Sequence, residues 1–367
     1  MSSALDRAVT AMAHAGVDAL LVGPGADLRY LTGYHALPLE RLTLLVARAD
    51  GGHTLVVPEL ERPRAEDAPL PAGLELVDFA ETDDPYRLVS AALEGLGNTP
   101  RLGVGDRLWS LFLLRLQAAV PGAWWTPAST VTSELRMRKS PAEIEALRRA
   151  GQAIDRVHAG VPELLRPGRT EAEVGRDIAE RIVAEGHDEV NFVIVASGPN
   201  GASPHHETGD RRLSEGDAVV VDIGGTLDGY CSDCTRNYVI GTAPAGYVEA
   251  HQALEAAQRA AVDVAGPGAT AAQVDAAARA VLDEAGYGRW FVHRTGHGIG
   301  LEEHEEPYIV AGNDRALEPG MAFSIEPGVY LPGRFGMRIE DIVVVNDAGC
   351  ERLNTLERAA VRTEPAT

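Results

Sequence analysis

An internal repeat in the second half of the chain constrains the fold more than any other feature of the sequence. The segment PGRTEAEV, residues 167–174, matches PGATAAQV, residues 267–274, with five of eight residues identical at an offset of 100. A helical stretch, a glycine turn at Gly186 or Gly286 and a strand-like stretch follow each copy. A duplicated α+β unit that shares one sheet would bring the strand ends of both copies near a pseudo-twofold axis, where a common site can form. Chance similarity in an alanine-rich chain is the alternative explanation.

Two carboxylates stand in β-rich sequence after the first copy. The stretch AVVVDIGGTLDGYCSDCTRNYVIG, residues 218–241, consists of two β-rich runs around a glycine-containing turn. If the turn centres on Leu227 and Asp228, Asp222 and Asp233 lie opposite each other on one face of the hairpin, with Cβ atoms about 5 Å apart. The pattern therefore predicts two converging carboxylates.

A second pair of carboxylates follows the second copy. In MAFSIEPGVYLPGRFGMRIEDIVVV, residues 321–345, Glu326 ends one apolar strand and Glu340 lies inside the next. Burial of a carboxylate costs free energy unless the group is paired, and close carboxylates repel each other by about 4 kcal/mol at an effective dielectric constant near 20. Arg338, two residues before Glu340, offsets part of that charge, and divalent metal ions could neutralise the rest.

Three histidines of the segment FVHRTGHGIGLEEHEEP, residues 291–307, are candidates for a metal-bound imidazole. His293 and His297 are four residues apart, which on a helix would give the paired ligands of a zinc protease, but the nearby glycines disfavour a helix. The spacing alone leaves open which of His293, His297 and His304 binds a metal. One imidazole with four carboxylates suits Mn²⁺, Co²⁺, Fe²⁺ or Zn²⁺, and two such ions about 3.5–4 Å apart would lower the pKa of a shared water towards 7.

Charge and lysine usage exclude several function classes. The formal net charge is −21, from 33 basic and 54 acidic residues, so the protein repels nucleic acid and anionic lipid, and neither is expected as a partner. Lys139 is the only lysine and lies in RMRKSP, which is no phosphate-binding loop, so a Walker-type NTPase is excluded. No G-x-S-x-G motif occurs, so a serine hydrolase with a nucleophile elbow has no support. The N-terminal segment lacks the features of a secretory leader and no apolar run reaches 18 residues, so we expect a cytoplasmic protein.

The pattern along the chain predicts two domains. Residues 1–130 alternate helix-like and strand-like segments, as in a self-contained α/β domain. Residues 126–141, TPASTVTSELRMRKSP, are polar, contain prolines and lack periodicity, so we place the linker there and begin the second domain at residue 131. A capping box with proline at the first helical position, Ser140-Pro141-Ala142-Glu143, predicts a helix from residue 141.

In these residues the sequence is similar to the pita-bread metallopeptidases, and within them to the Xaa-Pro aminopeptidases and prolidases. Five candidate ligands occur in the family's order Asp, Asp, His, Glu, Glu, and DLRYLTGYH, residues 27–35, resembles the family's N-terminal domain. The resemblance implies an α+β fold. A pita-bread catalytic domain, residues 131–367, would consist of duplicated α+β units around a shared sheet, and a smaller creatinase-like α/β domain would span residues 1–130.

The resemblance also implies a dinuclear metal site. Two divalent ions, with Mn²⁺ expected ahead of Co²⁺, Fe²⁺ or Zn²⁺, would be bound by the five candidate ligands, and Asp233 and Glu340 would bridge them. These ligands are Asp222, Asp233, His297, Glu326 and Glu340. Among His293, His297 and His304, the resemblance therefore implies that His297 binds the metal.

Further side chains acquire roles from the same resemblance. His205, in ASGPNGASPHH, would donate a hydrogen bond to the tetrahedral intermediate, His293 would shape the proline subsite, and His304 would contact the substrate or the intermediate. Glu326 would also carry a proton to the leaving nitrogen, and Arg338 would support the site. For the three histidines, a purely structural role in a glycine-rich loop is the alternative. His206 is expected to occupy a less constrained position.

The implied activity is release of the N-terminal residue from short peptides with proline in second position, as by an Xaa-Pro aminopeptidase. A prolidase restricted to dipeptides is the alternative, and a non-catalytic pita-bread binding module is a more remote one. Some dipeptide-restricted relatives have an arginine where this chain has Tyr308, which favours the aminopeptidase, although Arg41 or an arginine from a partner subunit could replace it. By resemblance, the protein is expected to form a homodimer.

Overall fold

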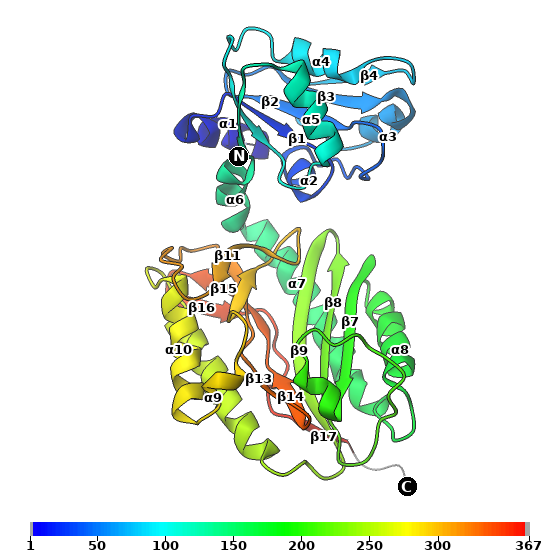
Figure 1. The fold of residues 1–367 in the computed structure, drawn as a ribbon, viewed down its shortest axis with the longest axis vertical. Coiled ribbons are helices and arrows are strands. Elements are labelled where there is room, and N and C mark those ends of the chain that lie inside the picture. Colours follow the sequence, from blue (N-terminus) through cyan, green and yellow to red (C-terminus); the bar gives the residue numbers. More distant parts are fainter. Residues whose placement is uncertain (1–2, 364–367) are drawn as a thin grey trace. The chain divides into compact units, whose positions relative to one another are not determined.

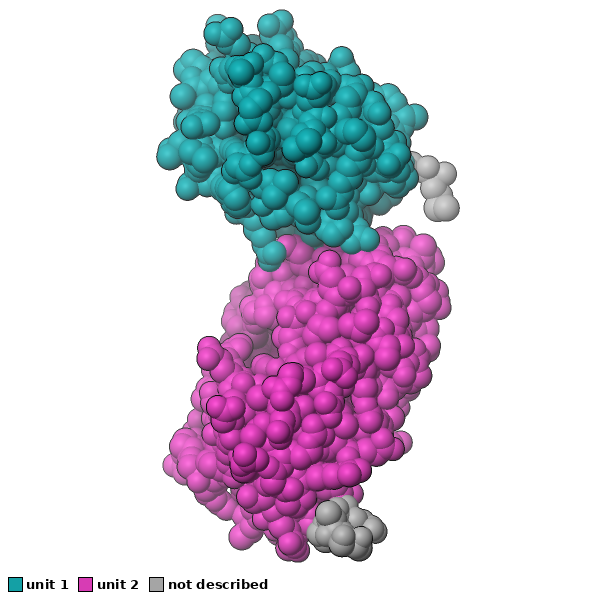
Figure 2. All heavy atoms as spheres, turned by 90° about the vertical axis from the view of Figure 1, so that its right-hand side faces the viewer, with its two compact units in different colours: residues 1–136 teal, residues 137–367 magenta. Residues whose placement is uncertain are grey.

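A computed structural model describes residues 3–363, and the chain divides into two compact units, residues 1–136 and 137–367 (Figures 1 and 2). Each unit has hydrophobic cores of its own. Among the described residues, no helix is both long enough and apolar enough to span a bilayer. Cys231, Cys234 and Cys350 are free thiols.

The first unit is built on a six-stranded mixed sheet with the strand order β4-β3-β2-β1-β5-β6, which confirms an α/β domain. Its elements are α1 (Ala4–Ala15), β1 (Ala19–Val22), α2 (Ala26–Thr32), β2 (Leu44–Arg48), β3 (His53–Pro58), η1 (Glu59–Glu61), α3 (Arg62–Glu66), β4 (Leu74–Phe79), α4 (Pro85–Ala92), β5 (Arg101–Val104), α5 (Ser110–Ala119), β6 (Trp124–Pro127) and α6 (Ser129–Met137). The hairpin of β2 and β3 turns through Gly51 and Gly52, whose φ angles are positive (92° and 77°). Glycine adopts such angles without steric cost.

Helix α6 occupies the segment that the sequence predicts to be an irregular linker. Its Thr132 hydroxyl donates a hydrogen bond to Asp27 Oδ2 (2.9 Å), and its Arg136 guanidinium pairs with Asp27 Oδ1 (2.7 Å). These contacts come from a helix more than a hundred residues earlier in the chain. A short helix gains most of its stability from such tertiary contacts, so local sequence could not predict it.

The second unit places two pairs of helices around two curved sheets (Figure 1). Its elements are α7 (Pro141–Gly160), η2 (Val161–Glu163), α8 (Glu171–Ala184), β7 (Glu189–Ser197), η3 (Gly198–Ala202), β8 (Ala218–Leu227), β9 (Tyr230–Ile240), α9 (Tyr247–Val264), α10 (Ala271–Glu284), η4 (Gly288–Trp290), β10 (Gly296–Gly298), β11 (Glu305–Ile309), β12 (Ala322–Ile325), β13 (Gly328–Leu331), β14 (Phe335–Arg338), β15 (Asp341–Asn346), β16 (Gly349–Arg352) and β17 (Val361–Thr363). Helices α7 and α8 pack on the sheet β17-β9-β8-β7, and α9 and α10 pack on the sheet β11-β10-β12-β15-β16. Hydrogen bonding thus divides the strands into two sheets and a β13-β14 hairpin, where one shared sheet was expected.

The internal repeat is visible as repeated structure. Both copies start their helix with a capping box, Thr170 with Glu173 in α8 and Thr270 with Gln273 in α10. Just before each helix, the backbone amide of a glycine in the repeat donates a hydrogen bond to a leucine carbonyl. Gly168 donates to Leu213, which precedes β8 (2.8 Å), and Gly268 donates to Leu317, which precedes β12 (2.9 Å). The donors lie 100 residues apart and the acceptors 104, and this agreement in caps and hydrogen bonds would not follow from a chance match of letters.

Candidate metal centre

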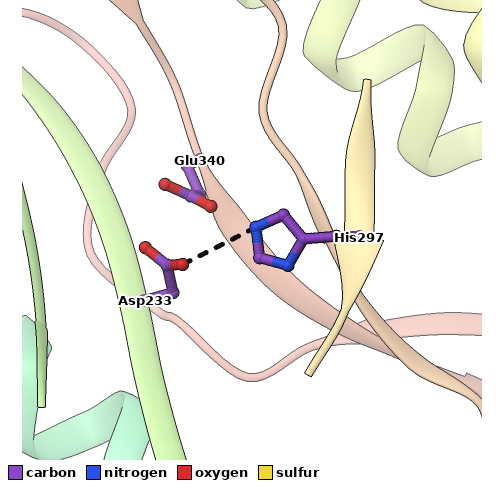
Figure 3. Close-up of side chains that lie close together, drawn as sticks. All are labelled: Asp233, His297 and Glu340. Atoms are coloured by element: carbon purple, nitrogen blue, oxygen red, sulfur yellow. Dashed lines mark ion pairs between the residues drawn. The ribbon is translucent and has the colours of Figure 1, made fainter. Parts of the chain in front are cut away.

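Strands of both repeat copies bring Asp233, His297 and Glu340 together in the interior of the second unit (Figure 3). All three side chains are buried, and one potential ligand atom of each lies within 4.8 Å of those of the other two. Asp233 comes from β9, His297 from β10, and Glu340 directly precedes β15. The distance from His297 Nε2 to Asp233 Oδ2 is 3.7 Å.

The tautomer of His297 favours a cation at this place. Its Nδ1 atom lies 3.2 Å from the Gly298 carbonyl oxygen, to which it can donate a hydrogen bond. Nε2 then points into the carboxylates and would offer its lone pair to a bound cation. A histidine that binds a metal usually donates its other ring N–H to such a backbone acceptor.

Asp222 lies on the same face of the hairpin as Asp233, but the register differs from the expected one. The turn is formed by Asp228 and Gly229, both with positive φ (52° and 88°), one position later than expected. Asp222 is therefore paired with Thr235 and not with Asp233. An Asp-Gly turn of this kind matches the twist of a β-hairpin. Because the partners move by two residues, both aspartates keep the same face.

The two glutamates leave their sheet at the same point. The last residue pair of β12 and β15 is Ile325 opposite Asp341. Glu326 directly follows β12 and Glu340 directly precedes β15, so the two glutamates lie at the same end of this strand pair. Glu340 thus lies between β14 and β15, and not inside a strand as expected. Glu326 Oε1 lies 3.3 Å from His297 Nε2. The structure therefore gathers all five predicted ligands around one point.

Arg338 places a positive charge against this cluster from the end of β14. Its guanidinium pairs with Asp222 Oδ2, donates to Thr235 Oγ1 (3.0 Å) and lies 4.0 Å from Glu326 Oε2. It also donates to the Tyr330 hydroxyl (2.9 Å). One guanidinium offsets a single charge of the four carboxylates, as the sequence suggested.

The carboxylates perturb one another strongly. Burial, followed by the charges of neighbouring carboxylates, raises the pKa of Asp233 and of Glu340 well above their ordinary values. Burial also opposes ionisation of Glu326, but its hydrogen bond to His297 and the nearby cationic groups lower its pKa to about 2. Divalent cations would offset the negative charges that contribute to raising these two pKa values.

Thr235 reveals the same shortage of positive charge. Its hydroxyl oxygen lies 2.8 Å from Asp222 Oδ1 and 2.7 Å from Glu340 Oε2. A hydroxyl has one proton to donate, so it serves one of these carboxylates at a time. The other carboxylate needs a proton or a cation. Together with the ligand types, this contact fits a site for divalent metal ions such as Mn²⁺ or Zn²⁺.

Two of the predicted histidines lie beside the cluster. The ring of His304 contacts the ring of His297 edge-on, with a centroid distance of 3.9 Å. Burial, together with nearby cationic groups, lowers the pKa of His304 to about 4, so it is neutral at pH 7. His293 accepts a hydrogen bond at Nε2 from the Tyr330 hydroxyl (2.8 Å), while its Nδ1 donates to the Arg294 carbonyl oxygen (2.7 Å). Tyr330 thus links His293 to Arg338.

Of the two neighbouring histidines His205 and His206, the structure holds His206 in place and leaves His205 exposed, which is the reverse of the expectation. His205 is exposed and forms no hydrogen bond with another residue in the described part of the chain. His206 is half-buried, and its Nε2 lies 2.8 Å from Oε2 of the fully buried Glu171. The expectation that His206 is the less constrained of the two is wrong.

Sequence reasoning missed several residues that support the site. Thr235 and Tyr330 carry no signal of their own, because hydroxyls are common in strands. Arg236 did carry one, as a charge inside the apolar run of β9. Its buried guanidinium donates to the backbone carbonyls of Thr235 (3.0 Å) and Glu340 (2.6 Å) and to Asp341 Oδ1 (2.6 Å), so it fixes the backbone at the ligands.

Two family models match the chain and together cover most of it. The model of "Metallopeptidase family M24" matches residues 145–347. The model of the "Creatinase/Prolidase N-terminal domain" matches residues 5–138. The five clustered side chains all lie within the first of these matches.

The chain is also similar to named peptidases over nearly its whole length. It is 56% identical to "Probable dipeptidase PepE" of Mycobacterium tuberculosis over 95% of this chain and 93% of that protein. It is 33% identical to the Xaa-Pro dipeptidase of Pyrococcus furiosus, over 98% and 99% of the two chains. Among solved structures, dipeptidase PepE from Mycobacterium ulcerans matches with a TM-score of 0.93 at 53% identity, covering 98% of this chain and 97% of that one.

Proposed function

Because the chain belongs to metallopeptidase family M24 and carries a creatinase/prolidase N-terminal domain, we propose that it hydrolyses the bond before proline in short peptides with a free amino terminus. The observation that carries this proposal is the buried group of Asp233, His297 and Glu340, completed by Asp222 and Glu326. The printed names of the relatives, dipeptidase and Xaa-Pro dipeptidase, support the substrate class. Mn²⁺ as the metal, a homodimer and a cytoplasmic location stay predictions.

The five acidic and imidazole side chains would hold two divalent ions. When bound, these ions would supply an activated water molecule and polarise the scissile carbonyl. Glu326 is placed to move the proton, because its carboxylate lies 3.3 Å from His297 Nε2 at the cluster and is ionised at neutral pH. It can accept a proton from the attacking water and deliver it to the proline nitrogen, the leaving group.

Neutral histidines would complete the reaction centre. With its pKa near 4, His304 has one N–H to donate at pH 7 and carries no charge that would repel the substrate's ammonium group. A donor fixed beside the scissile carbonyl stabilises the developing oxyanion. His205, exposed and without a protein partner among the described residues, is free to do the same. His293 is held by Tyr330, as a residue that shapes a proline pocket should be.

The test is hydrolysis of an Xaa-Pro dipeptide and of the matching Xaa-Pro-Yaa tripeptide by the Mn²⁺-loaded full-length protein. We expect cleavage before proline that is lost on chelation and in Asp233→Ala. Cleavage of the tripeptide would indicate an aminopeptidase, and cleavage of the dipeptide alone a prolidase. A folded, metal-loaded protein that cleaves no proline peptide would favour the non-catalytic alternative.

A further inference from the structure

Arg294 is a half-buried arginine that lacks a carboxylate partner within residues 3–363. Its guanidinium lies over the ring of Tyr308, 4.4 Å from the ring centroid. The chain contains 54 acidic residues against 33 basic ones, and the buried arginines Arg136, Arg236 and Arg338 all pair with aspartates. The half-buried Arg358 also lacks a carboxylate but donates to Gln258 Oε1, whereas the guanidinium of Arg294 has no hydrogen-bond acceptor within residues 3–363.

The position of Arg294 is fixed next to the metal centre. It lies three residues before His297, and Tyr308 lies four residues after His304. The backbone amide of Thr295 donates to the carbonyl of Ile309 (2.9 Å), which holds the two segments side by side. The ring of His304, four residues before Tyr308, contacts the ring of His297. Arg294 and Tyr308 thus both belong to segments that carry a histidine of the cluster.

We propose that Arg294 binds the terminal carboxylate of the substrate and so makes the enzyme selective for dipeptides, an inference that rests on the proposed function. A guanidinium offers two parallel N–H groups that match a carboxylate. Stacking on Tyr308 restricts its rotation and leaves its edge available for these bonds. In a dipeptide the carboxylate belongs to the residue directly after the scissile bond. Each additional residue moves it away by about 3.3–3.6 Å.

This assignment changes what Tyr308 and Arg41 indicate about the length of the substrate. Tyr308 stands where some dipeptide-restricted relatives have an arginine, and the sequence therefore favours an aminopeptidase. In the structure the tyrosine ring supports an arginine from the neighbouring segment. Arg41, the substitute considered from the sequence, is already paired with Glu81 (2.8 Å) and Glu40. The cation is thus present at the expected place but comes from another position in the sequence.

The decisive comparison is between an Xaa-Pro dipeptide and its C-terminal amide, which lacks the carboxylate. We expect the Mn²⁺-loaded wild-type protein to prefer the free acid by about 10- to 100-fold in kcat/KM, the range for a hydrogen-bonded charge pair. Arg294→Gln should abolish this preference while its rate on the amide stays close to that of the wild type. Arg294→Lys, which keeps the charge but not the fork, should retain part of it.

Arg289 provides a matched control. Its guanidinium also lies 4.4 Å from an aromatic centroid, that of Trp290, but the residue is exposed and lies in η4. Arg289→Gln should keep the full preference for the acid. If Arg294→Gln does not fold, Arg294→Met, which keeps the aliphatic stem over Tyr308, takes its place in the comparison.

Two results would overturn the proposal: equal wild-type rates on acid and amide, or an Arg294→Gln variant that slows both substrates by the same factor. A binding measurement separates this failure from failure of the proposed function. Calorimetry with L-proline and L-prolinamide on metal-loaded protein requires no turnover. A wild-type preference for L-proline that Arg294→Gln removes supports the carboxylate site even if no peptide is cleaved, and its absence counts against the site.

Discussion

At the scale of single residues, Thr235 shows how much of the site depends on groups that bind no metal. Its hydroxyl contacts Asp222 and Glu340 and accepts a hydrogen bond from Arg338. Two carboxylates and their counter-cation are thereby held at one oxygen atom. Partners of this kind orient metal ligands and tune their affinity.

We expect Thr235→Val to weaken Mn²⁺ binding by about 10- to 100-fold, the usual effect of losing such a partner. Valine keeps the shape of the side chain but offers no hydrogen bond to the two carboxylates. Thr235→Ser retains the hydroxyl and should retain most of the affinity. Calorimetric titration of the metal-free protein with Mn²⁺ measures both variants, and an unchanged affinity in Thr235→Val would refute the role of the hydroxyl.

His158 predicts a pH dependence of stability that is independent of the metal centre. It is buried between the Tyr238 hydroxyl (2.9 Å) and the Cys234 carbonyl (3.0 Å), and burial, followed by the charge of Arg236, lowers its pKa to about 3. The unfolded chain binds this proton near pH 6.5, whereas the folded protein does not until about pH 3. The free energy of unfolding therefore falls as the pH drops through this window.

The expected contribution of His158 is a loss of up to about 1.4 kcal/mol per pH unit below 6.5. His158→Gln keeps a hydrogen-bonding side chain but removes the titrating group. Urea unfolding at pH 7, 6 and 5 should give a shallower pH slope for the variant than for the wild type. Identical slopes in the two proteins would show that His158 does not titrate in this way.

The candidate ligands could be predicted from residue type and position in the sequence. The residues that surround them could not be predicted in this way. Acidic residues inside apolar runs of sequence, such as Asp222 and Glu340, are recognisable because burial of charge is costly. Arg294 gave no such signal, because an arginine near a glycine-rich loop is ordinary until its lack of a carboxylate partner becomes visible. Only the three-dimensional arrangement places it over Tyr308.

At the scale of elements, the start of α8 fixes the loop that carries His205. Glu171, the first residue of this helix, is fully buried and accepts hydrogen bonds from Ser197 N (2.7 Å), Asn200 Nδ2 (3.1 Å) and His206 Nε2 (2.8 Å). Although burial opposes ionisation, these hydrogen bonds lower the pKa of Glu171. One buried carboxylate thus ties residues 197–206 to the helix.

We expect Glu171→Gln to loosen this loop and to destabilise the protein by about 1–3 kcal/mol, because the donors around the lost charge keep a weaker acceptor. Hydrogen exchange at residues 197–209 should accelerate, and kcat should fall with His205 less well placed. Glu173→Gln, on the same helix turn but only half-buried and with its side chain bonded only within the capping box, is the control. Equal exchange of the loop in both variants would count against the role of Glu171.

Elements were predicted best where one local rule decides them. The capping box at Ser140 starts α7 as expected, and Asp228-Gly229 makes the hairpin turn. The expected register failed by one turn position because both residues of that turn accept positive φ, which the apolar pattern does not reveal. Helix α6 failed for a different reason, since its stability comes from contacts with Asp27.

At the scale of the whole molecule, the metal centre connects the two repeat copies of the second unit. The first copy supplies Asp222 and Asp233 from β8 and β9, and the second supplies His297, Glu326 and Glu340 from around β10, β12 and β15. In each copy the antiparallel order is the same, β7-β8-β9 in one and β10-β12-β15 in the other. Neither copy alone contains all five candidate ligands.

This arrangement makes the metal-free protein carry a strain that the bound metal relieves. Asp233 is buried among Glu340, Asp222 and Glu326, whose charges oppose its ionisation. Repulsion between close carboxylates destabilises the metal-free state. A ligand that binds only the folded chain stabilises it by mass action, by about 2.7 kcal/mol at a concentration of one hundred times Kd.

We therefore expect Asp233→Asn to stabilise the metal-free protein and to weaken the binding of Mn²⁺. Without metal, the variant should unfold at a higher temperature than the metal-free wild type, because an amide removes one negative charge from the cluster at nearly constant volume. With Mn²⁺ the order should reverse, because the variant has lost a bridging ligand and gains little from the ion. Thermal unfolding of both proteins in EDTA and in Mn²⁺ decides the point. An equal Mn²⁺-induced rise in Tm would mean that Asp233 is not a ligand, and a lower Tm of the variant in EDTA would mean that the cluster is not strained without metal.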